Sequence, residues 1–355
     1  MKFENISFEE GINKEWVITN GLGGFASSTI LGINTRRYHG LLFAPLTPPA
    51  RRNLILSKVD ESIVINDKKY NLYSNMCVDN TSKGYKYLES FEKEYVPIFT
   101  YKVESVIIRK YICMEYGKNT VVVLYRVFNK NNKAKLILTP LLNFRDFHRE
   151  NVNHEFDIKQ EEYNGKLKVI LDGNSRHPIY INVTGGNYIK HDNDSFKNMY
   201  YKEEEKRGFD ALENHAIPGR YEINIEPFEQ KDITFVASFE ENIEPLDGKE
   251  VISSEIARLS GLLFDSQLEE EDRCRKYLKD FIIAADNFVV NRPSLGLHTI
   301  IAGYPWFLDW GRDTLISFEG LLLKTKRYDI AREVLLTSIQ DVKFGLVPNR
   351  IFRIW

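Results

Sequence analysis

Residues 99–143 read FTYKVESVIIRKYICMEYGKNTVVVLYRVFNKNNKAKLILTPLLN. Three runs rich in β-branched and aromatic residues, 99–114, 120–129 and 135–143, are separated by Gly117-Lys118-Asn119 and by the polar residues 129–133. Such runs are typical of strands, and Gly and Asn are typical of the turns between them. Since no amphipathic helical pattern lies between the runs, the segment predicts consecutive antiparallel strands.

The same pattern continues on both sides of this segment. Further runs with strand composition occupy 37–44, 54–65, 166–171, 179–183 and 232–239, and turn residues such as Asn66-Asp67 and Gly185-Gly186-Asn187 lie between them. Many strands with short turns are typical of a sandwich of two sheets. We therefore expect residues 1–245 to form an antiparallel β-sandwich.

The period of the apolar residues changes after residue 247. Apolar residues recur every three or four positions over 251–263 and 277–289, which predicts two amphipathic helices. The acidic residues 269–272 suit the start of the second helix, and Pro293 lies beyond its expected end. Two more helices are expected over 314–325 and 328–342. This pattern predicts a linker helix over 246–265 and a separate helical domain over 266–355.

Composition excludes several classes of protein. Forty-eight Lys and Arg balance fifty Asp and Glu, so the chain lacks the positive field typical of proteins that bind nucleic acid or anionic membranes. No apolar run reaches the ~18 residues that span a bilayer, and no signal peptide is recognisable, so we expect a cytoplasmic protein without a membrane partner.

The cysteine and histidine residues indicate no metal site and no cofactor. The chain contains neither a C-x-x-C pair nor an H-E-x-x-H motif. We expect Cys77, Cys113 and Cys274 to be reduced, buried thiols.

The strongest functional signal is residues 303–314, GYPWFLDWGRDT, in which Trp306, Asp309, Trp310, Arg312 and Asp313 alternate. A sugar ring has apolar faces and a rim of hydroxyls, so its binding site needs flat aromatic surfaces bordered by carboxylates and donors. A structural explanation competes with this one. Asp313 could be a helix N-cap, Asp309 or Asp313 could pair with Arg312, and both tryptophans could lie in the core.

Three other sets of residues allow both interpretations. The glycine-rich residues 20–29 lack the spacing of a phosphate-binding loop, so a hairpin turn is favoured. Arg36, Arg37 and His39 could contact a ligand or lie on an exposed strand with paired charges. Residues 145–148, Arg-Asp-Phe-His, could line a cleft or form an internal salt bridge.

These motifs together resemble a known family. Residues 15–28 and 34–42, with the shorter matches 56–58, 145–148, 207–210 and 300–314, resemble bacterial and archaeal glycogen debranching enzymes. The resemblance implies a multidomain β-then-α fold, in which an antiparallel β-sandwich is followed by an (α/α)6 six-hairpin glycosidase barrel.

The resemblance also implies a function, the inverting hydrolysis of α-1,6-linked glucosyl branches of glycogen or limit dextrin. The partner would then be glycogen or another branched α-glucan. Asp313 would be a catalytic carboxylate, taken as the general acid, and Trp306, Asp309, Trp310 and Arg312 would bind the glucosyl ring beside it. Inverting glycosidases use a second carboxylate to activate water.

Residues 351–355 depart from the family pattern. A barrel of twelve helices needs on the order of 200 residues, but only about ninety follow residue 265. We therefore expect an incomplete barrel without the second carboxylate, and an inactive fragment of the enzyme. The alternatives are a non-catalytic glucan-binding β-sandwich module, or another six-hairpin glycosidase acting on trehalose, mannosylglycerate or linear α-glucan.

Overall fold

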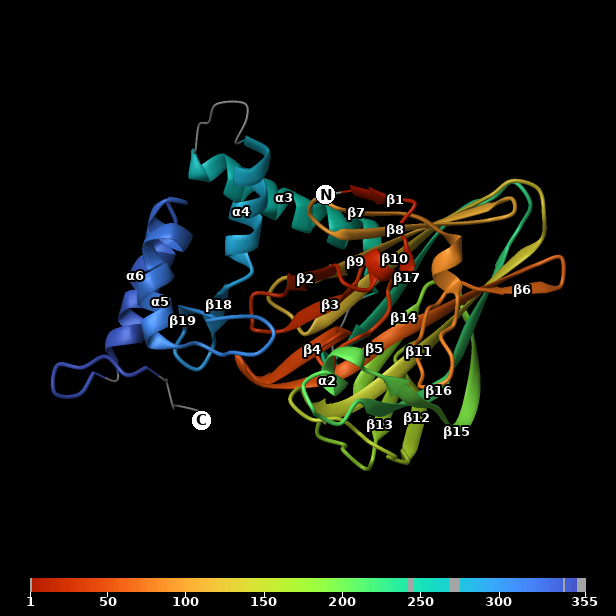
Figure 1. The fold of residues 1–355 in the computed structure, drawn as a ribbon, viewed down its shortest axis with the longest axis horizontal. Helices are drawn as coiled ribbons and strands as arrows, with labels where there is room; N and C mark the ends of the chain where they lie inside the picture. Colours follow the sequence, from red (N-terminus) through yellow and green to blue (C-terminus); the bar gives the residue numbers. More distant parts are fainter. Residues whose placement is uncertain (1, 242–244, 268–274, 341, 350–355) are drawn as a thin grey trace.

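The computed structural model of the chain describes residues 2–241, 245–267, 275–340 and 342–349. Strands make up the first two thirds of the chain, and helices predominate from Gly248 onward. Figure 1 shows the strands on the right, the helical part on the left, and a connection between them through α3 and α4.

The first of the two large sheets is antiparallel throughout the described residues. Its nine strands lie in the order β1 (Lys2–Glu4), β7 (Leu88–Lys93), β8 (Pro97–Val103), β9 (Val106–Met114), β10 (Thr120–Asn129), β17 (Gln230–Ser238), β14 (Ile179–Val183), β13 (Lys166–Leu171) and β12 (Ile158–Tyr163).

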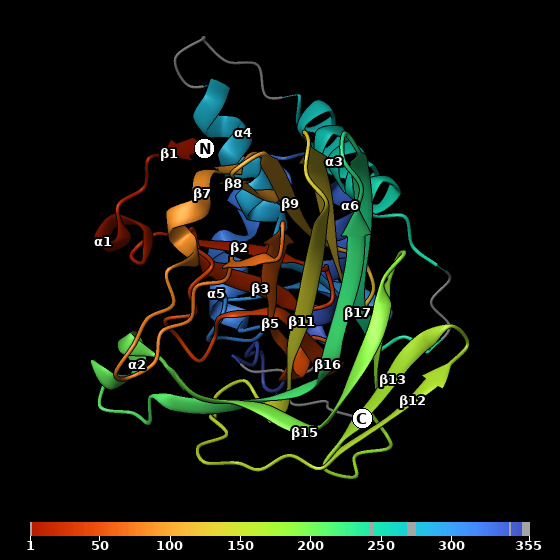
Figure 2. The ribbon, with the colours of Figure 1, turned by 90° about the vertical axis from the view of Figure 1, so that its right-hand side faces the viewer.

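The second sheet is also antiparallel and contains the longest strands of the described chain. Its order is β15 (Asn187–Tyr200), β16 (Leu212–Ile225), β11 (Ala134–Asp146), β5 (Ala50–Ile65), β4 (Gly40–Thr47), β3 (Phe25–Thr29) and β2 (Glu15–Thr19), and β6 (Lys68–Asn71) pairs with β5. Figure 2 shows this sheet facing the first one, with the helices behind them.

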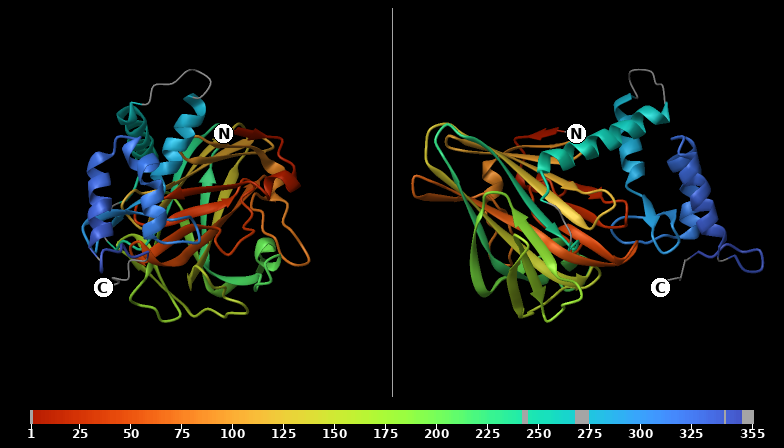
Figure 3. Two further views of the ribbon diagram at one scale, coloured as in Figure 1. Left: turned by 60° about the vertical axis from the view of Figure 1, so that its left-hand side comes forward. Right: turned by 180° about the vertical axis from the view of Figure 1, so that it is seen from behind.

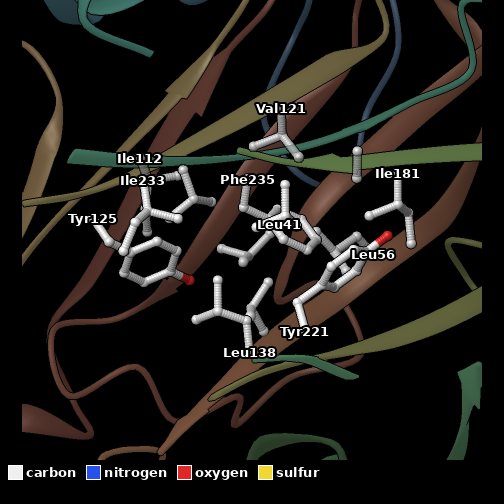
Figure 4. Close-up of a cluster of buried hydrophobic side chains, with 14 of the residues drawn as sticks. Leu41, Leu56, Ile112, Val121, Tyr125, Leu138, Ile181, Tyr221, Ile233 and Phe235 are labelled. Atoms are coloured by element: carbon white, nitrogen blue, oxygen red, sulfur yellow. The ribbon is translucent and has the colours of Figure 1, made fainter. Parts of the chain in front are cut away.

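One apolar core lies between the two sheets. Figure 4 shows Leu56 and Leu138 of the second sheet packing toward Ile112 and Phe235 of the first, and all four side chains are buried. Tyr125 reaches across the core, where its hydroxyl donates to Glu61 Oε1 at 2.7 Å. Because strand side chains alternate between faces, this shared core requires the apolar alternation that the sequence shows. The expectation of mainly antiparallel sheets packed face to face is confirmed.

Several predicted strands have their predicted bounds, and one predicted strand is a hairpin of two. β10, β13 and β14 span the predicted residues. Residues 99–114, however, form the hairpin of β8 and β9 rather than a single strand. Glu104 lies at the turn with a positive φ of 49°. The turn was missed because it contains neither Gly nor Asn.

The helices are of two kinds. Short turns lie within the strand-rich part, and the longer helices follow it. The bounds are α1 (Phe8–Gly11), the 3-10 helix η1 (Gly84–Tyr87), α2 (Lys202–Glu205), α3 (Gly248–Ser266), α4 (Arg275–Asp286), α5 (Gly311–Phe318), the π-helical η2 (Glu319–Leu323) and α6 (Tyr328–Ile339).

Helix α3 joins the helical part to the first sheet. Asp247 caps its N-terminus by accepting a bond from Lys249 N, and Ile252 packs against Cys113 and Leu124 of β9 and β10. Figure 3 shows α3 lying along this sheet while α5 and α6 stand away from it.

The predicted helix over 277–289 is too long. Helix α4 ends at Asp286, and Val289 begins β18 (Val289–Arg292), which pairs with β19 (Leu297–Ile300). The side chain of Val289 packs with Leu322 and Val334 in a small second core. The apolar pattern therefore predicted correctly that Val289 is buried, but the backbone of Val289 is extended and not helical.

Two remaining predictions concern the cysteines and the start of α4. Cys113 is buried, but Cys77 is only half-buried, so the expectation of a buried thiol is wrong for Cys77. Cys274 and the acidic residues 269–272 lie outside the described residues. No helix of the described chain has the length and apolar character that crossing a membrane requires.

Candidate active site

The segment that the sequence singled out forms a closed loop between β19 and α5. Ile301 and Asp309 make an antiparallel bridge, and Ala302 N donates to Leu308 O at 2.8 Å. The loop extends toward the β-sandwich, as the blue strand-to-helix connection in Figure 1 shows. Its backbone bonds hold residues 302–308 as one unit.

Arg52 of β5 fastens this loop to the β-sandwich. Its side chain is fully buried, and it donates from Nη1 to Pro305 O at 3.0 Å and from Nη2 to Phe307 O at 3.1 Å. The guanidinium lies 4.9 Å from the centre of the Tyr304 ring. Burial lowers the pKa of Arg52, but an arginine side chain keeps its charge in proteins. The fork of two donors therefore fixes the position of the loop.

Asp309 is buried and forms an ion pair with Arg292 of β18, with 2.5 Å between Oδ2 and Nη1. Burial raises the pKa of Asp309, and the charge of Arg292 opposes that shift. The expected pairing with Arg312 is therefore wrong for Asp309. This carboxylate holds the end of the loop to the β18–β19 hairpin.

The two tryptophans of the loop are not core residues. Trp306 is 39 % exposed, and its ring lies edge-on to Tyr38 at 6.1 Å. Trp310 is half-buried and meets Phe307 at 5.7 Å. The interpretation of both tryptophans as core is wrong, since each indole keeps surface that a ligand can reach.

Asp313 lies in the first turn of α5 but does not cap the helix. The N-cap position belongs to Trp310, which makes no side-chain cap bond, so the prediction of an Asp313 cap is wrong. Asp313 Oδ2 is buried and has no hydrogen-bond partner among the described residues. A carboxylate oxygen left without a donor costs free energy, and a bound ligand that supplies the partner removes this cost.

Arg312 is exposed beside this carboxyl group. Its backbone N donates to Asn349 Oδ1 at 2.9 Å, and Gly311 N donates to Asn349 O at 2.9 Å. These bonds place residues 348 and 349 against the start of α5. A Cβ on Gly311 would lie 2.4 Å from Pro348 O, so only glycine permits this approach.

The glycine-rich segment is the hairpin turn between β2 and β3, as predicted. Asn20 Oδ1 accepts bonds from Leu22 N and Gly24 N, and Gly21 and Gly23 have positive φ. The same turn also contacts the helical part of the chain, because Asn291 N donates to Gly21 O at 2.8 Å. It therefore joins two parts of the chain instead of cradling a phosphate.

Arg37 and Arg145 are buried in a charged network, whereas Arg36 is half-buried and pairs with Glu15 at 2.7 Å. Arg37 binds Glu204 through Nε and Nη2 at 2.9 and 2.8 Å, and Arg145 pairs with Glu213 at 2.5 Å. The prediction of an exposed strand at Arg37 is wrong, since the residue lies in a buried turn. The internal salt bridge at Arg145 is confirmed. His215, also buried, contacts Glu213, and burial lowers its pKa to about 4.

Sequence reasoning missed the residues that support the loop from a distance. Arg52, Tyr38 and Arg292 all lie outside the 303–314 motif, and no spacing connects them to it. The burial of Arg52 in a strand marks its role, but burial cannot be read from the sequence, so the sequence held no usable signal. The described residues contain no group of three or more His, Cys, Asp or Glu arranged to hold a metal ion.

Two family models match the chain. One, described as glycogen debranching enzyme N terminal, matches residues 14–232, and one described as amylo-alpha-1,6-glucosidase matches residues 283–353. The glycogen debranching enzyme of Saccharomyces cerevisiae is 39 % identical over 62 residues. That match covers 16 % of this chain and only 4 % of the yeast protein.

The chain is also similar to solved structures. A bacterial glucoamylase complexed with acarbose is 11 % identical with a TM-score of 0.39, over 95 % of this chain and 50 % of that one. A 4-alpha-glucanotransferase from Thermococcus litoralis is 12 % identical with a TM-score of 0.28, over 58 % and 29 %. Both TM-scores are too low to support an argument about fold or function.

Proposed function

The chain belongs to the glycogen debranching enzyme N-terminal family, and from this membership we propose that it binds a branched α-glucan and takes part in hydrolysing its α-1,6 branches. By resemblance to the amylo-alpha-1,6-glucosidase model it is a glycoside hydrolase. We further propose that the helical part, 266–355, belongs to an (α/α)6 barrel and that 1–245 is its β-sandwich partner.

One observation carries the proposal. The loop carries the exposed indole of Trp306 and the half-buried indole of Trp310, and the helix that begins at its end carries Asp313, whose buried Oδ2 lacks a hydrogen-bond partner among the described residues. Flat aromatic surfaces next to a carboxyl group suit a glucosyl ring and its glycosidic oxygen. The clamp from Arg52 supports the loop on the rigid β-sandwich, as a binding site requires.

Each residue has a proposed role. Trp306 and Trp310 stack against the sugar, and Arg312 donates to its hydroxyls. Asp313 gives its proton to the glycosidic oxygen while the bond from C1 to that oxygen breaks. Inversion also requires a base that removes a proton from the attacking water, and we assign this role to none of the described residues. Asp309, held by Arg292, positions the loop.

The test is calorimetric titration of the 355-residue chain with limit dextrin. Trp306→Ala should weaken binding about tenfold, a loss of about 1.4 kcal/mol. The matched control is Phe228→Ala, because Phe228 is exposed and lies in the turn after β16, at the opposite end of the sheet from Arg52. Equal affinities of the two variants would contradict the proposed site. We expect no glucose release without the base.

A non-catalytic glucan-binding role is the second candidate. It is favoured by the ion pair between Asp309 and Arg292. Because of this pair, Asp313 is the one carboxyl group within 303–314 that is available to a ligand. Binding without any acid-dependent chemistry would select this alternative.

A further inference from the structure

An exposed aromatic ring lies on the β-sandwich outside the loop. Phe209, which follows helix α2, is 51 % exposed. The guanidinium carbons of Arg37 and Arg207 lie over its ring at 4.6 and 5.0 Å from the centroid. Such cation–π contacts hold the ring in place, and about half of the surface of the residue remains accessible to solvent.

The surroundings of Phe209 are rigid. Glu204 is fully buried and accepts bonds from both guanidinium groups, at 2.8 Å from Arg37 and 3.3 Å from Arg207. Arg145 Nη2 fixes the backbone of Arg37 by donating to its carbonyl oxygen at 2.7 Å. A ring supported in this way loses little conformational entropy when a ligand stacks on it.

Phe209 is connected to the loop indirectly, through Arg37 and Tyr38. The guanidinium of Arg37 lies 5.7 Å from the Tyr38 ring, and Tyr38 lies 6.1 Å from the ring of Trp306. The exposed ring of Phe209 is therefore linked to the exposed ring of Trp306 through two buried side chains, Arg37 and Tyr38.

The chemistry beside Phe209 also suits a sugar. The side chain of Arg207 is 42 % exposed, and it carries five N–H donors, of which Nη1 bonds to Glu204. An exposed ring bordered by exposed donors repeats the pattern around Trp306. Arg37 is buried and fully engaged with Glu204 and Glu150, so it positions the ring.

We propose that Phe209 and Arg207 form a second sugar-binding surface, which holds glucosyl units distant from the unit bound at Trp306. This inference rests on the proposed function, because the glucan must first be placed at the loop. The β-sandwich then contributes directly to recognition of the glucan, favouring long chains over short ones.

The test compares two ligands and four variants of the full chain. Maltoheptaose and maltose are titrated by calorimetry into Phe209→Leu, Phe209→Trp, Trp306→Ala and the control Phe228→Leu. Phe209→Leu keeps an apolar side chain but removes the flat ring, so affinity for maltoheptaose should fall about five- to tenfold, the scale of an aromatic stacking contact. Affinity for maltose should not change. Phe209→Trp should retain the affinity for maltoheptaose.

The outcomes separate the two proposals. If Trp306→Ala weakens binding of both ligands but Phe209→Leu changes neither, the second surface is overturned and the proposed function stands. Equal losses for maltose and maltoheptaose in Phe209→Leu would show a general disturbance and would also overturn the surface. If the unsubstituted chain binds neither ligand, both the second surface and the proposed function are overturned.

Discussion

Arg52 Nη1 donates a hydrogen bond of 3.0 Å to Pro305 O, although the two residues are 253 positions apart in the chain. The bond joins the start of β5 in the second sheet to the loop that carries the tryptophans. Two carbonyl oxygens accept from this one side chain, so the position of the loop depends on the β-sandwich.

Arg52→Lys should loosen the loop. Lysine cannot reach both carbonyl oxygens with a planar fork, and a lost bond to a charged donor costs about 1.5–3 kcal/mol. Hydrogen exchange measured by mass spectrometry should increase in peptides covering 301–313. Arg220→Lys is the control, because Arg220 forms a partly exposed ion pair with Glu222 that contributes little. Unchanged exchange in the loop would show that Arg52 does not hold it.

Asp313→Asn should remove the acid-dependent step. Azide attacks C1 without a general base, so limit dextrin and azide should yield glucosyl azide from the 355-residue chain as Asp313 protonates the departing oxygen. The substitution should lower this rate ~10²-fold or more. Product analysis by chromatography provides the measurement.

The matched control is Asp329→Asn, since Asp329 occupies the first turn of α6 as Asp313 does that of α5. Equal rates in the two variants would show that the acid is another residue. Absence of glucosyl azide from the unsubstituted chain would favour the non-catalytic alternative.

Gly311→Ala should destabilise the start of α5. The added Cβ would lie 2.4 Å from Pro348 O, and relieving such overpacking costs roughly 1–3 kcal/mol. Gly320→Ala is the control, because nothing lies within 4 Å of its added Cβ. Thermal unfolding should show a lower midpoint for Gly311→Ala alone. A midpoint equal to that of the control would refute the close approach.

Stability should fall as the pH is lowered through the window set by His215. Its pKa is lowered from 6.5 to about 4 by burial in the folded protein. The unfolded chain therefore binds more protons between these values, and stability decreases from pH 6.5 toward pH 4 by about 3 kcal/mol at most. Urea unfolding across this range should show a shallower pH dependence for His215→Gln. Parallel curves would contradict the buried neutral histidine.

The outer faces of α5 and α6 should bind an apolar dye. Ile316 is 78 % exposed, and Leu335 and Ile339 are also exposed. An amphipathic helix normally buries such residues against a neighbour. We expect anilinonaphthalene fluorescence to rise with the chain and to fall in the double variant Ile316→Glu, Ile339→Glu. No decrease in the double variant would place the dye elsewhere.

Strands with continuous or alternating apolar residues were predictable. The bounds of β10 follow from its run of valines, which pairs on both sides within the first sheet. Strand β15 was missed because it is mostly polar and exposed and so leaves no apolar alternation in the sequence. Strand β16 was missed although Tyr221, Ile223 and Ile225 alternate and are buried in the core.

The candidate site was partly predictable for a related reason. Trp306, Trp310 and Asp313 are neighbours in sequence, and their chemistry is recognisable without a structure. The ion pair of Asp309 with Arg292 depends on the β18–β19 hairpin, and the clamp from Arg52 depends on tertiary packing. Neither leaves a local pattern. Short-range chemistry was therefore visible, but the groups that orient it were not.

The hairpin turn at residues 20–24 has a consequence for the order of folding. Gly21 O accepts a hydrogen bond from Asn291 N, so this bond closes a loop that contains most of the chain. Closing so long a loop lowers the conformational entropy of the chain before the contact can stabilise it. A chain folding during synthesis orders its N-terminal part first. We therefore expect the turn and its strands β2 and β3 to form before Asn291 is synthesised. The β-sandwich thus provides the preformed surface against which the later helices pack.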